Sequence, residues 1–145
     1  TNQGGVARGR YGEDDVDRVH REIAGLVDHA AGRRGLIDRF YYCPFHPEAT
    51  VDAYRREHPW RKPQPGMLLQ AARDLGLDLT GSWMIGDQPR DIEAGHSAGC
   101  RTVQLGSLPE SATFAVAPTA SATTLVRPST SSLRRESPPV VAVRR

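Results

Sequence analysis

Two aspartates follow a short apolar run in the segment SWMIGDQPRDIEAGHSAGC, residues 82–100. Asp87 comes directly after Gly86, where a strand would end, and Asp91 stands four residues later, in the first turn of a helix. There Asp91 could accept hydrogen bonds from backbone N–H groups or orient a metal-bound water. In the alternative, Asp87 forms a turn and Asp91 caps the helix, and these two residues taken alone favour that alternative.

Two further segments carry groups that suit a phosphate. In WRKPQPGM, Arg61 and Lys62 precede two prolines and a helix start, which makes a rigid corner with two cations. Lysine offers phosphate a compact charge and arginine a bidentate fork. In the opening TNQGG, a hydroxyl, an amide and successive glycine N–H groups could surround an anion. Alone, each segment is also explained as a solvated basic pair or an ordinary turn.

The elements around these segments alternate between helix and strand. Helical spacing of apolar residues predicts helices over residues 16–30, 67–75 and 91–98, each followed by a glycine. Runs of apolar, β-branched and aromatic residues predict strands over residues 36–43, 82–85 and 101–105, with a long loop over 44–66. This order indicates an α/β protein with a parallel sheet covered by helices. Ligands of such sheets bind beyond the carboxyl ends of the strands, where Asp87 stands.

Composition places the chain among ordinary globular proteins. It has 145 residues, a formal net charge of +2 and 25% charged residues, which suits one modest domain. No apolar stretch is long enough to span a membrane, no leader opens the chain, and Cys43 and Cys100 are too few for a disulfide framework. We therefore expect a soluble, cytoplasmic monomer that binds neither nucleic acid nor membrane.

The alternation of helices and strands stops at Ser107. Residues 107–145 are dominated by Ser, Thr, Pro and Ala, with Phe114 as the one aromatic residue, so we expect a mostly disordered tail. The folded domain would then comprise residues 1–106. Because the chain begins at Thr1, inside a glycine-rich turn and without a methionine, we also expect the start of this domain to be missing.

The order of the three chemical segments is more specific than any one of them. Thr-Asn-Gln-Gly comes first, then Arg-Lys-Pro-x-Pro-Gly-Met before a helix, then strand-Gly-Asp-x-x-x-Asp. Over residues 1–106 this order resembles the haloacid dehalogenase (HAD) superfamily of phosphatases, whose fold is Rossmann-like. More narrowly, it resembles subfamily IIIA, the branch of the D-glycero-D-manno-heptose 1,7-bisphosphate 7-phosphatases and histidinol-phosphate phosphatases.

The resemblance implies a magnesium-dependent hydrolase that acts on a small phosphorylated sugar, best matched by heptose 1,7-bisphosphate, through an aspartyl-phosphate intermediate. Asp87 would bind Mg²⁺, and Asp91 would support that site. As catalytic residues, Thr1 would hold the transferring phosphoryl group and Lys62 would neutralise its charge. The opening loop and the cationic corner would together bind the substrate through Thr1, Asn2, Gln3, Gly4, Arg61 and Lys62.

The nucleophile is one departure from the family. Its members attack with the first Asp of an Asp-x-Asp pair, on a strand that precedes the Thr-Asn-Gln loop. Every Asp in this chain follows that loop, so we expect the first strand to be absent and the chain as given to be inactive. The alternative is a non-catalytic module that binds a phosphorylated ligand, and the codons before Thr1 would discriminate between the two.

The zinc loop is the other departure. Relatives in this branch carry Cys-x-His and Cys-x-Cys before Arg-Lys-Pro, which forms a four-coordinate zinc site. Here Cys43 keeps the first position, Phe45 replaces the histidine, and neither later cysteine is present. A shifted site of Cys43, His46 and His58 would have three ligands, so we expect no zinc. We expect instead a metal-free loop packed by aromatic side chains, namely Phe45, Tyr54 and Trp60.

Overall fold

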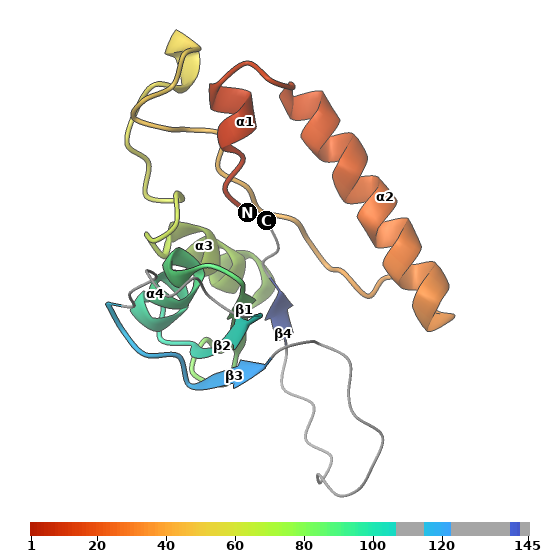
Figure 1. The fold of residues 1–145 in the computed structure, drawn as a ribbon. Helices are drawn as coiled ribbons and strands as arrows, with labels where there is room; N and C mark the ends of the chain where they lie inside the picture. Colours follow the sequence, from red (N-terminus) through yellow and green to blue (C-terminus); the bar gives the residue numbers. More distant parts are fainter. Residues whose placement is uncertain (107–114, 123–139, 143–145) are drawn as a thin grey trace, which may run out of the picture. The chain divides into compact units, whose positions relative to one another are not determined.

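A computed structural model describes residues 1–106, 115–122 and 140–142. The chain divides into two compact units, Thr1–Arg61 and Lys62–Arg145. The first unit contains the helices α1 (Gly4–Ala7) and α2 (Glu13–Ala31) and the 3-10 helix η1 (Asp52–Tyr54). The second contains two helices and the strands (Figure 1), which are α3 (Gly66–Leu75), β1 (Trp83–Gly86), α4 (Pro89–Ser97), β2 (Arg101–Leu105), β3 (Ala120–Ala122) and β4 (Val140–Ala142).

The strands described in the second unit form one sheet in the order β3-β2-β1-β4, and all neighbours are parallel. In the central pair, Trp83 lies opposite Arg101 and Gly86 lies opposite Gln104. Because the strands are parallel, their carboxyl ends share one edge of the sheet, and Asp87 follows β1 at that edge. The predicted parallel sheet with covering helices is confirmed.

Helix α4 lies directly against β1 and β2. A methyl group on Gly95 would lie 2.6 Å from Met84 Cβ and 2.8 Å from Thr102 Cγ2, so only a glycine allows this approach. Five buried apolar residues of this unit form a core cluster: Leu68, Met84, Ala94, Ala98 and Cys100. This packing fixes the first turn of α4, which carries Asp91, relative to the end of β1.

The predicted helices and strands of the second unit are confirmed with small shifts at their ends. Helix α3 follows Pro65 and ends at Gly76, whose φ of 64° lies in the left-handed region that favours glycine. Strand β2 spans the predicted residues, and β1 runs on to Gly86. Helix α4 begins at Pro89, ahead of Asp91, because a proline suits the first turn, where its missing N–H is not needed.

Two strands come from the range that was predicted to be mostly disordered. β3 pairs with β2 and β4 pairs with β1, each over three residues. Beside β3, Thr102 N donates to Thr119 Oγ1 (2.9 Å) and Thr119 N donates to Thr102 Oγ1 (3.0 Å). A short edge strand depends on backbone partners more than on apolar surface, so composition did not predict it. Residues 107–114, 123–139 and 143–145 lie outside the described part, where disorder stays a prediction.

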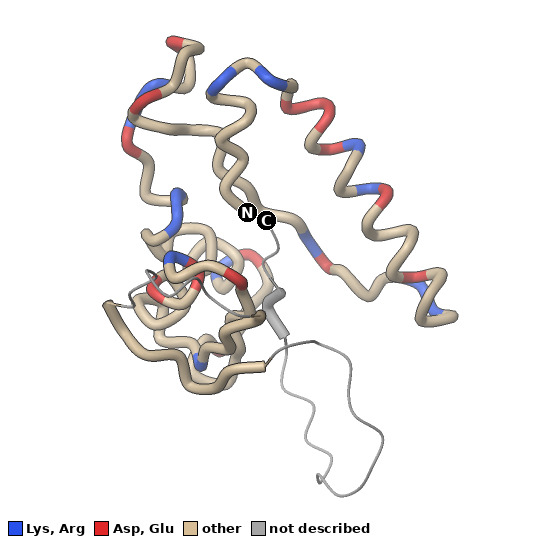
Figure 2. Tube along the Cα trace, in the orientation of Figure 1, with Lys and Arg blue, Asp and Glu red and all other residues tan. Residues whose placement is uncertain are grey.

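Helix α2 is the long helix of the first unit, and its prediction is confirmed. Asp15 accepts a hydrogen bond from Gly12 N (2.9 Å) at its start, and Gly32 ends it with φ 64°. Acidic residues gather in its first turn, and both basic and acidic residues follow along the helix (Figure 2). Of its predicted core face, Val16 is buried, whereas Leu26 is 65% exposed. No helix among the described residues is long and apolar enough to cross a membrane.

The strand predicted over residues 36–43 is wrong, because the structure has no strand there. Cys43 forms a single parallel bridge with Asn2, in which Gln3 N donates to Cys43 O and Cys43 N donates to Thr1 O, both over 2.9 Å. A strand needs a paired backbone along its length, and this pairing stops where the chain enters α1 at Gly4. Helix α1 in turn occupies part of the opening that was expected to be a loop.

Candidate functional site

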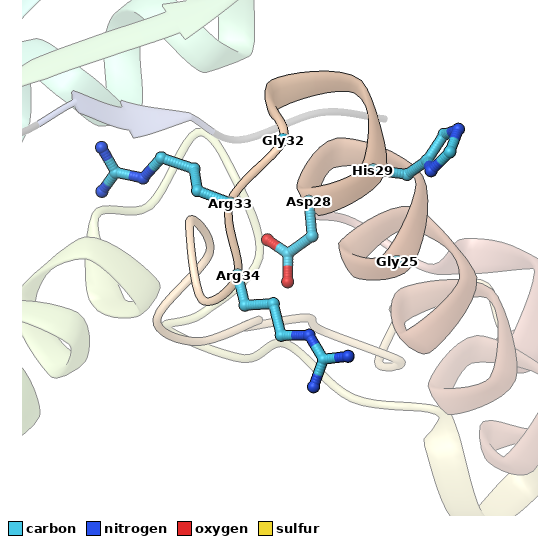
Figure 3. Close-up of a pocket in the computed structure, with 6 residues that line it drawn as sticks. All are labelled: Gly25, Asp28, His29, Gly32, Arg33 and Arg34. Carbon is cyan, nitrogen blue, oxygen red and sulfur yellow. The ribbon is translucent and has the colours of Figure 1, made fainter.

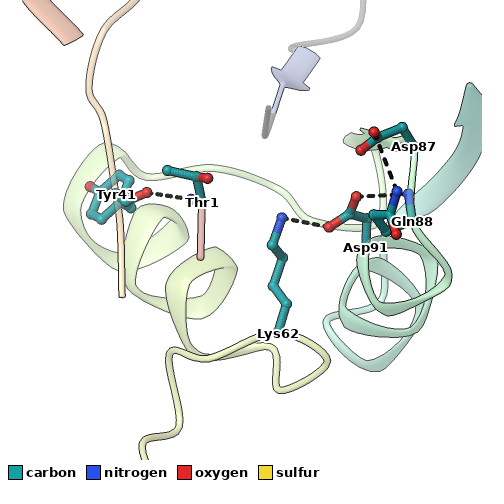
Figure 4. Close-up of polar contacts among 6 residues, drawn as sticks. All are labelled: Thr1, Tyr41, Lys62, Asp87, Gln88 and Asp91. Carbon is teal, nitrogen blue, oxygen red and sulfur yellow. Dashed lines mark hydrogen bonds and ion pairs between the residues drawn. The ribbon is translucent and has the colours of Figure 1, made fainter. Parts of the chain in front are cut away.

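A buried ion pair links two of the predicted site residues in the second unit. Lys62 Nζ lies 2.5 Å from Asp91 Oδ1, and the two side chains are 5% and 4% exposed (Figure 4). Lys62 precedes α3 and Asp91 lies in α4, so the pair joins two elements. Charges this deeply buried need close partners, which makes the position of each dependent on the other.

Asp91 is also held by the start of its own helix. Gln88 N donates to Asp91 Oδ2 (3.1 Å), and Asp91 N donates to Gln88 O (2.9 Å). This is the reciprocal pattern of a capping box, with Gln88 as the N-cap and Asp91 at the third helical position. The N-cap of α4 is thus Gln88, whereas the alternative placed Asp91 there. Asp91 contributes to the cap from inside the helix and has the ionic contact in addition.

Gly86 allows Asp91 to approach the end of β1. A methyl group on Gly86 would overlap Asp91 Cβ, and it would lie 2.5 Å from Asp91 Oδ2. Any other residue would push α4 away from the strand. The absence of a side chain at Gly86 thus makes room for the Asp91 side chain.

Asp87 stands at the carboxyl end of β1, half-buried, and its Oδ2 accepts a hydrogen bond from Gln88 Nε2 (3.4 Å). Mg²⁺ prefers hard oxygen ligands, usually one or two carboxylates together with water and phosphate oxygens. Asp87 supplies such a carboxylate. Both oxygens of Asp91 are engaged within the protein, because Oδ1 pairs with Lys62 and Oδ2 accepts a hydrogen bond from Gln88 N. The residues therefore suit Asp87 as a ligand of Mg²⁺ and Asp91 as a support of that site.

The other predicted site residues belong to the first unit. Thr1 is buried, and its main-chain nitrogen donates to Tyr41 O (2.6 Å; Figure 4). Gln3 Oε1 accepts from Tyr11 Oη (2.8 Å), and Gly4 begins α1. The structure thus assembles the opening segment in one unit and Lys62, Asp87 and Asp91 in the other.

Arg61 is the last residue of the first unit, and it forms a hydrogen bond with the loop that precedes it. Its Nη1 donates to Phe45 O over 3.2 Å. The Phe45 ring stacks on His58, with centroids 4.6 Å apart, and the Arg56 guanidinium lies 3.8 Å from the Phe45 centroid. Phe45 also contacts Tyr54, with centroids 5.9 Å apart, as predicted. The roles of Arg56 and His58 were missed, because cation–π and stacking partners depend on how the loop folds.

The three zinc candidates do not form a metal site. Cys43 Sγ lies 4.0 Å from His58 Nδ1, and that nitrogen already accepts a hydrogen bond from Trp60 N (3.1 Å). His46 Nδ1 accepts from Glu48 N (3.0 Å). The described residues contain no group of three or more His, Cys, Asp or Glu side chains arranged to hold a metal. The residues present therefore do not fit zinc.

The first unit also has a pocket (Figure 3). It is lined at the end of α2 by Gly25, Asp28, His29, Gly32, Arg33 and Arg34. Asp28 accepts hydrogen bonds from Gly35 N (2.9 Å) and Leu36 N (3.1 Å), and these bonds lower the pKa of Asp28. The carboxylate therefore holds the turn after the helix, and no predicted site residue lines the pocket.

Known proteins share the segment that carries the ion pair. Residues 59–126, which include Lys62, Asp87 and Asp91, match the family described as HAD-hydrolase-like. Over 105 residues the chain is 44% identical to the D-glycero-alpha-D-manno-heptose-1,7-bisphosphate 7-phosphatase of Burkholderia mallei, a match that covers 72% of this chain and 54% of the relative. The chain belongs to the HAD-like hydrolases.

Two further comparisons agree with this assignment. The chain is 46% identical over 99 residues to the D-glycero-beta-D-manno-heptose-1,7-bisphosphate 7-phosphatase of Rhodopseudomonas palustris, covering 68% of this chain and 53% of that HAD relative. A crystal structure of the D,D-heptose 1,7-bisphosphate phosphatase of B. bronchiseptica, complexed with magnesium and phosphate, matches with a TM-score of 0.60 and 30% identity. That match covers 79% of this chain and 64% of the other. The chain spans about half the length of the curated relatives it matches.

Proposed function

We propose that this protein is a magnesium-dependent phosphatase that hydrolyses a sugar-phosphate monoester, with D-glycero-D-manno-heptose 1,7-bisphosphate as its substrate. The observation that carries the proposal is the buried Lys62–Asp91 ion pair beside Asp87 at the carboxyl edge of the sheet. The 44% and 46% identical relatives are named for this substrate and support its choice.

The residues of the second unit suit phosphoryl transfer, which depends on positioned charge. Asp87 would hold Mg²⁺, which when bound neutralises charge on phosphate oxygens. Lys62 would place its ammonium group against the phosphoryl oxygens, and Asp91 would keep that group in position through the ion pair. Because the ion pair holds the Lys62 ammonium group in place, this group needs no rearrangement as negative charge develops on the phosphoryl oxygens.

The residues of the first unit would bind the substrate. Thr1 would hold the transferring phosphoryl group, and Asn2, Gln3 and Gly4 would line the substrate loop. Arg61, whose guanidinium is tied to Phe45 O, would recognise the phosphorylated sugar. We further propose that the protein acts as a cytoplasmic monomer and that the loop around Cys43 holds no zinc.

The nucleophile decides between catalysis and binding alone. The proposed aspartyl-phosphate intermediate needs an Asp-x-Asp pair ahead of Thr1. The test is to read the codons before Thr1 and to assay the product of the whole reading frame on heptose 1,7-bisphosphate with and without Mg²⁺. Magnesium-dependent phosphate release that is lost in Asp87→Asn is expected. A reading frame without the Asp pair, whose product binds phosphorylated sugars but releases no phosphate, would favour the binding module.

A further inference from the structure

A glutamate at the start of α2 accepts hydrogen bonds from two tyrosines that come much later in the chain. Tyr42 Oη donates to Glu13 Oε2 (2.8 Å), and Tyr54 Oη donates to Glu13 Oε1 (2.8 Å). All three side chains are half-buried and belong to the first unit, and we call them the Glu13 cluster. Because each carboxylate oxygen has its own donor, the cluster joins α2 to two distant segments.

Tyr42 stands in the middle of the segment that pairs with the opening residues. Thr1 N donates to Tyr41 O (2.6 Å; Figure 4), and Cys43 N donates to Thr1 O (2.9 Å). Gln3 N donates in turn to Cys43 O (2.9 Å), which completes a short parallel ladder of three hydrogen bonds. Residues 41 and 42 belong to no strand, so the position of this segment depends on its side chains. The hydroxyl of Tyr42 binds it to α2.

Tyr54 binds the loop after this segment to the same carboxylate. It is the last residue of η1, and His46 N donates to Tyr54 O (3.1 Å) beside the parallel bridge between His46 and Arg55. The two oxygens of Glu13 thus hold both the segment that pairs with Thr1 and the loop that follows it.

We propose that Glu13 is a positioning residue, which through its two tyrosines fixes the opening residues Thr1–Gln3 for the substrate. This inference rests on the proposed function, in which Thr1 holds the transferring phosphoryl group. Phosphoryl transfer depends on position, and a misplacement of about 1 Å can cost about 100-fold in rate. Glu13 acts through other residues and does not itself touch the substrate.

Both tyrosines are kept in the protonated form that the cluster needs. Burial, followed by the hydrogen bond to Glu13, raises the pKa of Tyr42 above its usual 10.0. For Tyr54, the hydrogen bond to Glu13 is the largest cause of a raised pKa. Both hydroxyls therefore remain donors to the carboxylate at neutral and mildly alkaline pH.

Amide hydrogen exchange of the 145-residue chain, followed by NMR, tests the cluster without any reaction. Tyr42→Phe should speed exchange of the Gln3 and Cys43 amides by about tenfold or more, because both amides donate across the ladder. Tyr54→Phe should instead speed exchange of the His46 amide, which donates to Tyr54 O. Both changes keep the ring and remove only the hydroxyl.

Glu13→Ala removes both acceptors and should speed exchange of all three amides. Asp14→Ala is the matched control, since Asp14 is the next acidic residue in the same turn and is exposed, and its three amides should exchange as in the wild type. Unchanged exchange of the Gln3 and Cys43 amides in both Tyr42→Phe and Glu13→Ala would overturn the proposal.

Kinetics of the product of the whole reading frame separate positioning from stability. Glu13→Ala and Tyr42→Phe should lower kcat/KM on heptose 1,7-bisphosphate by about tenfold or more. Val16→Ala, a change at a buried residue of α2, is the control, because it should lower the melting temperature and leave kcat/KM unchanged. Wild-type kcat/KM in Glu13→Ala would overturn the positioning role. A product without phosphatase activity would contradict the proposed function, and exchange of the Gln3 and Cys43 amides would still decide whether the cluster fixes the opening residues.

Discussion

Lys62 Nζ and Asp91 Oδ1 lie 2.5 Å apart, with both side chains almost completely buried. The contact joins the corner before α3 to the first turn of α4, so one pair of charges ties both helices to the edge of the sheet where Asp87 stands. Loss of either charge leaves the other buried and alone, which costs more than loss of both. The pair therefore has a role in folding as well as a proposed role in catalysis.

Lys62→Ala should lower the free energy of unfolding by about 3–5 kcal/mol, because it leaves the Asp91 carboxylate buried without its partner. The double variant Lys62→Met/Asp91→Asn should recover much of this loss, since neither residue then carries a charge and Asn can still accept from Gln88 N. Urea unfolding followed by circular dichroism measures both.

The exposed pair of Arg18 and Asp15 is the control, and Arg18→Ala should cost no more than about 1 kcal/mol. If Lys62→Ala costs as little as Arg18→Ala, the ion pair does not hold the two helices together.

Gly86→Ala and Gly95→Ala should each destabilise the second unit by about 1–3 kcal/mol or more, because their methyl groups would meet Asp91 Cβ and Met84 Cβ. Gly25→Ala is the control, since no atom lies within 4 Å of a methyl group there. As Gly25 lies inside α2, this change should stabilise by about 0.5–1 kcal/mol. Thermal melts of the three variants rank their stabilities. Equal effects at all three positions would contradict the close approach of α4 to the strands at Gly86 and Gly95.

Local sequence patterns predicted the helices and strands around the site, but they could not predict contacts between segments that are distant in the sequence. Helix α3 and strand β2 were correct because apolar spacing and a terminal glycine act within a few residues. Residues 36–43 had the composition of a strand but no paired backbone beyond the Asn2–Cys43 bridge. Lys62 and Asp91 were each predicted as site residues, yet their direct pairing depends on how α4 packs.

The 145-residue polypeptide should release no phosphate from sugar phosphates, because no residue in it matches the family's nucleophile. In the product of the whole reading frame, Lys62→Met and Asp87→Asn should each lower kcat/KM by orders of magnitude, about 3 kcal/mol apiece if they act on transition-state charge. Asp91→Asn should cost less, since its proposed role is support. Steady-state kinetics on variants shown to be folded checks this order, and near-normal rates for either main variant would place the site elsewhere.

The free energy of unfolding should fall on acidification, in part through His58. Burial and the nearby Arg56 guanidinium lower the pKa of His58 below its usual 6.5. Between the two pKa values the unfolded chain binds a proton that the folded chain excludes, so stability is lost as pH falls through about 6.5 and down to the folded pKa.

His58→Phe keeps a ring against Phe45 and removes this proton. Since the pKa values of His20 and His46 are also lowered, the wild type and the variant must be compared. Urea unfolding between about pH 8 and about pH 5 should show that the free energy of unfolding falls less in the variant than in the wild type. His96→Gln is the control, since His96 is exposed. Parallel pH profiles for wild type and His58→Phe would contradict the assignment.

Purified protein should carry far less than one zinc per chain, and chelation should leave its melting temperature unchanged. In a zinc site the deprotonated ligands converge on one ion, and the binding energy becomes folding energy. Here His58 Nδ1 accepts from Trp60 N and the His58 ring stacks on Phe45, so the loop is closed by hydrogen bonds and aromatic contacts. Cys43→Ser should therefore cost little, whereas Phe45→Ala should lower the melting temperature by several degrees, as expected for about 1–2 kcal/mol. Elemental analysis decides the question: one zinc per chain, whose removal by a chelator lowers the melting temperature sharply, would show that Cys43 and the two histidines rearrange around a metal.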